Sequence, residues 1–178
     1  MSRAYRVTWV NVSGSVTTSD TLTMPVELLP ILAPARMADL LRDELCIENK
    51  EWTRNSDGSM SLRVNDTTAT LDPETAKVTI TADAKGDVAE RGVNAADAEQ
   101  NLERGKVKLK EHLTGELARQ LTDAEATVRT LLQAAIQRAY VRALKEKAAS
   151  MGTVTSIDEG PEGPEGGGDY VVTIKVRV

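Results

Sequence analysis

The chain has 178 residues, of which 40% are apolar and 28% charged, and its formal net charge is −5 at pH 7. The single cysteine excludes an internal disulfide framework and a cysteine-based zinc site. The single histidine makes a poly-histidine metal site or an ordinary histidine-dependent catalytic triad hard to build within one chain. The acidic balance argues against a general nucleic-acid binder, and no apolar run approaches the roughly 18 residues of a membrane-spanning helix. Together with a start that has no signal-peptide core, these properties predict a cytoplasmic protein with a single domain over residues 1–178.

Residues 1–93 are typical of a β-rich region. Tyr5, Val7 and Trp9 alternate with polar residues, which is the period of a half-buried strand. Similar alternation over residues 52–64 and 68–81 predicts successive hairpins of a meander. The turns are expected at residues 55–58, where Gly58 tolerates a positive φ, and at residues 72–75, where Pro73 suits the second turn position.

One short helix is expected between the first strand and this meander, over residues 34–47. Pro34 suits a helix start, where its missing N–H costs nothing. Apolar residues then follow at helical spacing, namely Met37, Leu40, Leu41 and Leu45. Cys46, at the end of this helix, is interpreted as a small buried hydrophobic residue.

Residues 94–151 contain no proline and are helical in composition throughout. A continuous helix would measure about 85 Å at 1.5 Å per residue, whereas a compact chain of this length is about 40 Å wide. Residues 122–125 have the form of a capping box, because Thr122 precedes Glu125 by three positions. We therefore expect two helices, over residues 94–120 and 123–150; a single projecting arm is the alternative.

The second of these helices has a broad apolar face, with an apolar or aromatic residue at every fourth position. This face is wider than one contact with a sheet requires. We expect it to pack against the sheet and a second helix, which belongs either to the same chain or to a second copy in a homo-oligomer. Its members include Val128, Leu132, Ile136, Tyr140, Leu144 and Ala148.

A C-terminal hairpin is expected over residues 152–178. Gly152 follows the helix, as glycine commonly does past a C-cap. Strands are predicted over residues 153–157 and 170–178, and the Gly-, Pro- and Glu-rich residues 159–168 between them predict a mobile loop. The predicted fold is therefore α+β, an antiparallel sheet with long helices packed on one face.

Residues that carry chemistry are few. His112 has no partner at metal-ligand spacing, so it is interpreted as a surface residue. The adjacent acids Asp43 and Glu44, like Asp158 and Glu159, have side chains that diverge on a regular element. No glycine-rich phosphate loop is present. We expect no catalytic residue, no metal ligand and no cofactor; the alternative is a metal-dependent hydrolase or nuclease whose acids converge only in the fold.

One cationic strip is a candidate contact for a partner. Arg138, Arg142 and Lys145 follow at spacings of four and three, so they share a helix face, and Tyr140 lies among them. Such a strip is a solvated helix surface, a protein contact or a phosphate-binding patch of a nucleic-acid sensor. These three interpretations remain open.

The last part of the chain resembles a known family. The segment 136–142, then Met151 with Gly152, a short valine strand, Asp158 with Glu159, and the strand 172–178 are similar to the end of a conserved chloroplast-genome reading frame and its bacterial relatives. Some of those relatives are encoded beside FtsH-type AAA+ ATPases in ternary systems. The resemblance implies a non-enzymatic accessory component or adaptor that works with an AAA+ ATPase.

Overall fold

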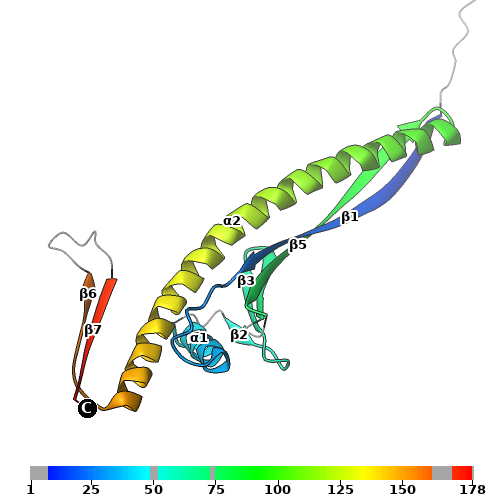
Figure 1. Cartoon of the computed structure of the whole chain (residues 1–178). Helices are drawn as coiled ribbons and strands as arrows, with labels where there is room; N and C mark the ends of the chain where they lie inside the picture. Colours follow the sequence, from blue (N-terminus) through cyan, green and yellow to red (C-terminus); the bar gives the residue numbers. More distant parts are fainter. Residues whose placement is uncertain (1–7, 49–51, 73–74, 162–169, 178) are drawn as a thin grey trace, which may run out of the picture. The chain divides into compact units, whose positions relative to one another are not determined.

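The computed structural model describes residues 8–48, 52–72, 75–161 and 170–177 (Figure 1). The predicted α+β class is confirmed. Strands form an antiparallel five-stranded sheet in the order β1-β5-β4-β3-β2 and a separate two-stranded sheet of β6 and β7. In chain order the elements are β1 (Val10–Pro25), α1 (Pro34–Glu48), β2 (Thr53–Arg54), β3 (Met60–Val64), β4 (Thr67–Asp72), β5 (Lys77–Gly92), α2 (Ala95–Met151), β6 (Thr153–Pro161) and β7 (Tyr170–Arg177).

The chain divides into two compact units. The first holds residues 1–23, 63–69 and 79–127, and the second holds residues 24–62, 70–78 and 128–178. Each unit is described by itself below. The expectation of one domain over residues 1–178 stays a prediction.

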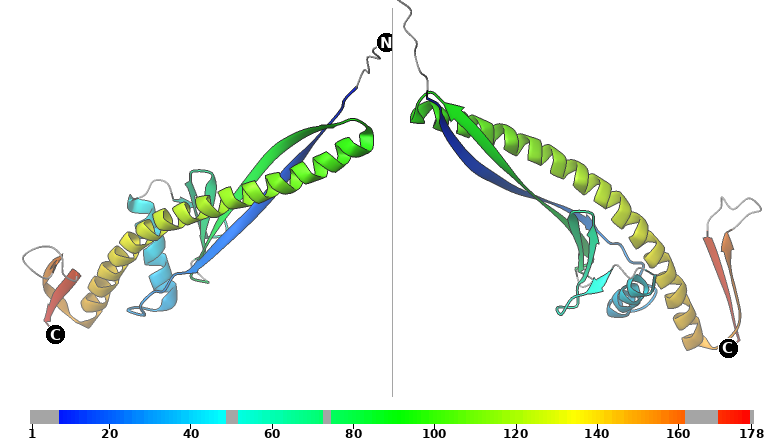
Figure 2. Two further views of the ribbon diagram at one scale, coloured as in Figure 1. Left: turned by 90° about the horizontal axis from the view of Figure 1, so that it is seen from above. Right: turned by 180° about the vertical axis from the view of Figure 1, so that it is seen from behind.

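In the first unit, β1 and β5 run side by side as a long ribbon beside the N-terminal half of α2 (Figure 2). Two glycines allow close packing between the ribbon and the helix. A Cβ on Gly86 would lie 3.1 Å from a Leu109 methyl carbon, and a Cβ on Gly105 would lie 2.8 Å from a methyl carbon of Val88. Small residues at these positions therefore let the backbones approach.

β1 and β5, the two strands of the ribbon, differ from the strands predicted from the alternation of apolar and polar residues. Tyr5 and Val7 lie outside the described residues, and Trp9 precedes β1, its side chain stacked beneath the Arg91 guanidinium at 5.1 Å. The segments 10–25 and 83–92 are strands although they are rich in polar and small residues. Their apolar alternation is weak, because one face of the ribbon is solvent-exposed and the other carries glycines and alanine as well as valines.

The expected break in the long helix is wrong, since α2 is one helix of 57 residues. The Thr122 hydroxyl donates to the Ala118 carbonyl, four residues back, at 2.9 Å, as a threonine does inside a helix. The true N-cap is Asn94, whose side-chain oxygen accepts from the Asp97 N–H at 2.9 Å. A buried stripe crosses the expected break without interruption, namely Leu113, Leu117, Leu121, Ala124, Val128 and Leu132. The expected break was based on the width of a compact chain. That width is therefore a poor guide to the length of this helix.

The meander is confirmed. β2 pairs with β3 in antiparallel register, with Arg54 opposite Met60, and Gly58 in the connecting turn has a φ of 85°. The Asp57 carboxylate accepts from the hydroxyl and N–H of Ser59, and these hydrogen bonds lower the pKa of Asp57. The second expected turn is described only in part, because Pro73 lies outside the described residues.

The C-terminal hairpin is present in the second unit, with β6 antiparallel to β7 and Thr153 opposite Arg177. β6 extends to Pro161, so residues 159–161 belong to a strand and not to the expected loop. Residues 162–168 of that loop lie outside the described residues. A Cβ at position 152 would lie 2.4 Å from the Arg177 carbonyl oxygen, so close packing is what requires Gly152.

Candidate interaction surface

The second unit contains the residues that the sequence marks as a candidate contact, and helix packing positions them. α1 packs on the C-terminal half of α2 through a core of Met37, Leu40, Ala139 and Ala143. The alanines keep α2 narrow at this contact, so the two helices approach closely. Leu28, Ile31, Leu32 and Tyr140 pack around this core. The broad apolar face of α2 is therefore covered in large part within the unit.

A buried carboxylate joins two of the candidate cations. The Glu44 side chain of α1 is only 6% exposed. It accepts from Arg138 Nε at 3.2 Å and from Arg142 Nη1 at 2.8 Å. Arg142 also lies 3.6 Å from Asp43, which is half-exposed. Each oxygen of Glu44 thus has a cationic donor, which is the condition for burying a carboxylate.

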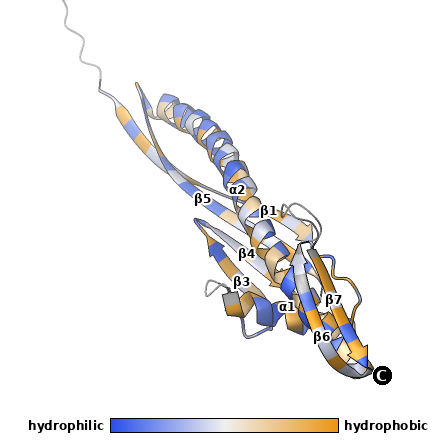
Figure 3. Ribbon diagram, turned by 90° about the vertical axis from the view of Figure 1, so that its left-hand side faces the viewer, coloured by the Kyte–Doolittle hydropathy of each residue, from blue (hydrophilic) through white to orange (hydrophobic). Residues whose placement is uncertain are grey.

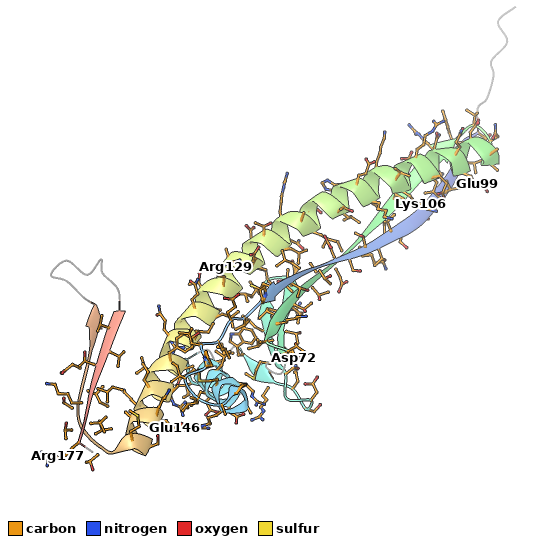
Figure 4. All side chains as sticks on the ribbon, in the orientation of Figure 1. Asp72, Glu99, Lys106, Arg129, Glu146 and Arg177 are labelled. Carbon is orange, nitrogen blue, oxygen red and sulfur yellow. The ribbon has the colours of Figure 1, made fainter. Side chains whose placement is uncertain are left out.

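A second ion pair lies at the start of α1. Arg36 donates from Nε to Glu146 Oε1 at 3.0 Å and from Nη2 to Oε2 at 2.9 Å. This fork holds the pKa of Glu146 below its ordinary value and raises the pKa of Arg36. Figure 4 shows Glu146 on the last turns of α2. Both side chains are more than 40% exposed, so the pair orients the helices more than it stabilises them.

Tyr140 fastens the segment before α1 onto α2. Its hydroxyl accepts from the Leu29 N–H at 3.0 Å and donates to the Glu27 carbonyl at 3.2 Å. These bonds satisfy two backbone groups of a segment that belongs to no regular element. The tyrosine ring itself packs beside the core of α1 and α2.

An apolar hollow of about 550 Å³ lies beside Tyr140 on this unit. Leu29, whose residue surface is 59% exposed, lies at its rim. The other lining residues come from the segment before α1, from α2 and from β7: Ile31, Gln137, Tyr140, Val141, Leu144 and Val172. An exposed leucine over an apolar hollow is the kind of surface that protein partners cover.

The structure thus gives the four candidate contact residues different surroundings. Arg138 and Arg142 contact Glu44, Tyr140 contacts the backbone at Glu27 and Leu29, and Lys145 is half-buried on the same helix. Glu44 was not predicted from the sequence to be the partner of these arginines. Its spacing from Met37, Leu40 and Leu41 places it on the buried face of α1, and an acid at such a position indicates a buried cationic partner.

Comparison with known families bears on the whole chain. The family model of FtsH ternary system domain X5 matches residues 1–178. The chain belongs to this family. No curated protein and no solved structure matches it.

Membership indicates that this X5 domain is an accessory component of an FtsH-associated system, as the resemblance of residues 136–142 and 172–178 implied. The family description names the ternary system and assigns no residue of the chain a role. The relation to the chloroplast reading frame stays a prediction.

The remaining candidate residues of the X5 domain are at the surface. His112 is exposed and lies 3.2 Å from Glu116. Cys46 is exposed as well, so its interpretation as a buried residue is wrong. It occupies the last turn of α1, where the neighbouring Ile47 also faces solvent, while Leu45 takes the buried position.

The acidic residues show no metal-binding arrangement in the described part of the X5 domain, where no three metal-ligating side chains converge. Asp43 and Glu44 face arginines, and Asp158 lies on β6 opposite Thr173. The absence of a metal or cofactor site stays a prediction. Among the described helices, none has both the length and the apolarity needed to cross a bilayer.

Proposed function

We propose that this X5 domain is a non-enzymatic adaptor of a bacterial FtsH ternary system, that it acts in the cytoplasm, and that it binds the AAA+ ATPase of that system. The family match over residues 1–178 is the observation that carries the proposal. Two of the candidate residues, Arg138 and Arg142, already have a structural partner within the second unit. Glu44 holds Arg138 and Arg142, and this charge pairing favours a protein contact over a phosphate-binding strip.

The contact surface we assign to the ATPase is the apolar hollow beside Tyr140. Leu29 is exposed at its rim, and Val141 and Leu144 line it from α2. Interface hot spots lie in well-packed pockets and are enriched in tyrosine, tryptophan and arginine, and Tyr140 lines this hollow. Arg142 and Lys145 lie next in sequence to Val141 and Leu144 and supply a polar neighbourhood.

Co-purification with an FtsH-type ATPase of the ternary system tests this proposal. Wild-type protein should retain the ATPase, and Leu29→Asp should lower retention about tenfold or more, because a carboxylate at the rim would have to be desolvated. Ile47→Asp is the matched control, since Ile47 is 66% exposed on α1 and does not line the hollow. Failure of the wild-type protein to retain the ATPase contradicts the adaptor role. Equal losses in the two variants contradict the assignment of the hollow.

Self-association is a second candidate use of the same hollow, because Val141 and Leu144 line it. Most of the broad face of α2 is covered within the unit, so a homo-oligomer would have to use the residues that remain accessible around Val141 and Leu144. In that case Leu29→Asp would also shift the sedimentation coefficient of the wild-type oligomer to that of a monomer. A wild-type protein that sediments as a monomer at high concentration contradicts self-association.

A further inference from the structure

The hairpin of β6 and β7 is a sheet of two strands in the described part of the chain, so each strand has a free edge. An isolated two-stranded hairpin is marginally stable in water. Its free edge offers N–H and C=O groups that can pair with another extended chain.

Two contacts show which way the backbone of β7 points. The Thr155 hydroxyl of β6 donates to the Lys175 carbonyl at 3.2 Å. The Arg177 carbonyl oxygen lies over Gly152, which precedes β6. Lys175 and Arg177 therefore direct their backbone groups toward β6, and since these groups alternate along a strand, those of Val172, Ile174 and Val176 point to the free edge. No described residue pairs with them there.

The side chains of the hairpin divide into an apolar and a polar face. Register places Val154 opposite Val176 and Ile157 opposite Ile174, so these four residues form an apolar patch on one face. Val172, on the same face of β7 and opposite Glu159, is one of the residues that line the hollow beside Tyr140. The other face of β7 is polar and exposed at Thr173, Lys175 and Arg177. In Figure 3, β7 is mainly hydrophobic with hydrophilic bands between the apolar ones, and Figure 4 shows Arg177 at its end.

We propose that the free edge of β7 binds an extended segment of a protein partner in which apolar residues alternate with acidic ones. Such a segment would add a third strand by pairing with the backbone of Val172, Ile174 and Val176. Its apolar side chains would extend the apolar face, and its carboxylates would lie beside Lys175 and Arg177. The inference rests on the proposed function in one respect, namely that the protein acts through a protein partner.

Charge favours a foreign acidic segment over a second copy of β7. Pairing of two β7 strands would bring Lys175 and Arg177 of both copies onto one face without an acidic residue of β7 to balance them. Like charges in neighbouring strands are destabilising, whereas opposite charges on a shared face stabilise the pairing.

Fluorescence anisotropy of labelled heptapeptides with the purified full chain tests the inference. A peptide that alternates valine and glutamate should bind about tenfold or more tightly than a peptide of the same composition with its valines and glutamates in separate blocks. Lys175→Glu with Arg177→Glu should weaken binding of the alternating acidic peptide about tenfold and should favour a peptide that alternates valine and lysine. Lys110→Glu, an exposed charge reversal in the first unit, is the control and should leave both affinities unchanged.

A second variant tests the backbone pairing. Val172→Pro removes an N–H that faces the free edge and leaves the groups that face β6 in place, so the hairpin should persist while peptide binding falls. Circular dichroism checks that each variant is folded. Equal affinity for the alternating and block peptides, or unchanged binding after the charge reversal, overturns the proposal. So does a wild-type oligomer that Val172→Pro converts to a monomer and Leu29→Asp leaves intact, because the edge then belongs to a second copy.

These outcomes are independent of the co-purification experiment, since peptide binding is measured without the ATPase. If the ATPase is not retained and the alternating acidic peptide still binds, the adaptor role fails and the edge site stands. If the ATPase is retained and the peptide does not bind, the edge site fails and the adaptor role stands.

Discussion

Glu44 is the residue whose setting most constrains the second unit. A carboxylate that is 6% exposed requires donors for both oxygens, and Arg138 and Arg142 provide them from α2. Both arginines are partly exposed, at 30% and 40%, so each guanidinium remains partly hydrated. The cluster therefore fixes α1 against α2 at a modest desolvation cost.

Replacing Glu44 by alanine should lower the free energy of unfolding by about 1–3 kcal/mol, because two charge-assisted hydrogen bonds between α1 and α2 are lost. Asp43→Ala is the control. Asp43 is 52% exposed and lies 3.6 Å from Arg142, so its loss should cost about 1 kcal/mol or less. Urea denaturation of both variants checks the difference, and equal losses would contradict a structural role for the buried carboxylate.

At the scale of elements, α2 shows how a buried stripe overrides a local stop signal. Thr122 and Glu125 have the spacing of a capping box, yet Leu121, Ala124 and Val128 continue the buried stripe across the same position. Stopping the helix there would expose these side chains. Burying these side chains contributes more stabilising free energy than an N-cap at Thr122 would, so the helix continues.

Whether Thr122→Ala raises or lowers the free energy of unfolding depends on whether α2 is continuous at this position. In an uninterrupted helix the variant should raise the free energy of unfolding by about 0.5 kcal/mol, because alanine has the higher helix propensity. If Thr122 were an N-cap, the same change would lower it by about 1 kcal/mol. Asn94→Ala, at the observed N-cap, should show that loss. Thermal unfolding followed by circular dichroism measures both variants, and a destabilised Thr122→Ala would contradict the continuous helix.

At the scale of the whole molecule, the two compact units share secondary structure. α2 and β5 each contribute residues to both units. A helix that melts in one unit loses hydrogen bonds at the boundary with the next, so the units are coupled through the backbone that they share. The prediction of one domain over residues 1–178 can be tested by unfolding experiments.

Two probes of unfolding should give coincident transitions. Trp52 lies in the second unit and is 4% exposed, so its fluorescence reports that unit once Trp9 is replaced by phenylalanine. The circular dichroism signal at 222 nm reports mainly α2, which spans both units. In the Trp9→Phe variant the two signals should have the same Tm, as expected for cooperative unfolding. Separate midpoints would contradict a single cooperative domain.

Local pattern was sufficient for many elements of this protein. Helical spacing after Pro34 predicted α1, and strand alternation predicted the meander and the last hairpin. The absence of proline over residues 94–151 predicted that this segment is helical, but not that it forms a single helix. The family resemblance also came from local segments, and membership is confirmed over the whole chain. These features depend on neighbours in the sequence, and periodicity records such neighbours directly.

Contacts between distant segments decided the rest. Glu44 meets Arg138 and Arg142 across separations of 94 and 98 residues, and no local pattern specifies which acid joins which base. The strand character of residues 83–92 comes from pairing and from close packing on α2, because alanine, glycine and charged residues have weak intrinsic preference for strands. Residues 10–25 contain valines and threonines, which favour strands, but the fold decides that they pair with β5. Burial and pairing are properties of the folded chain, so they emerge when remote residues are brought together.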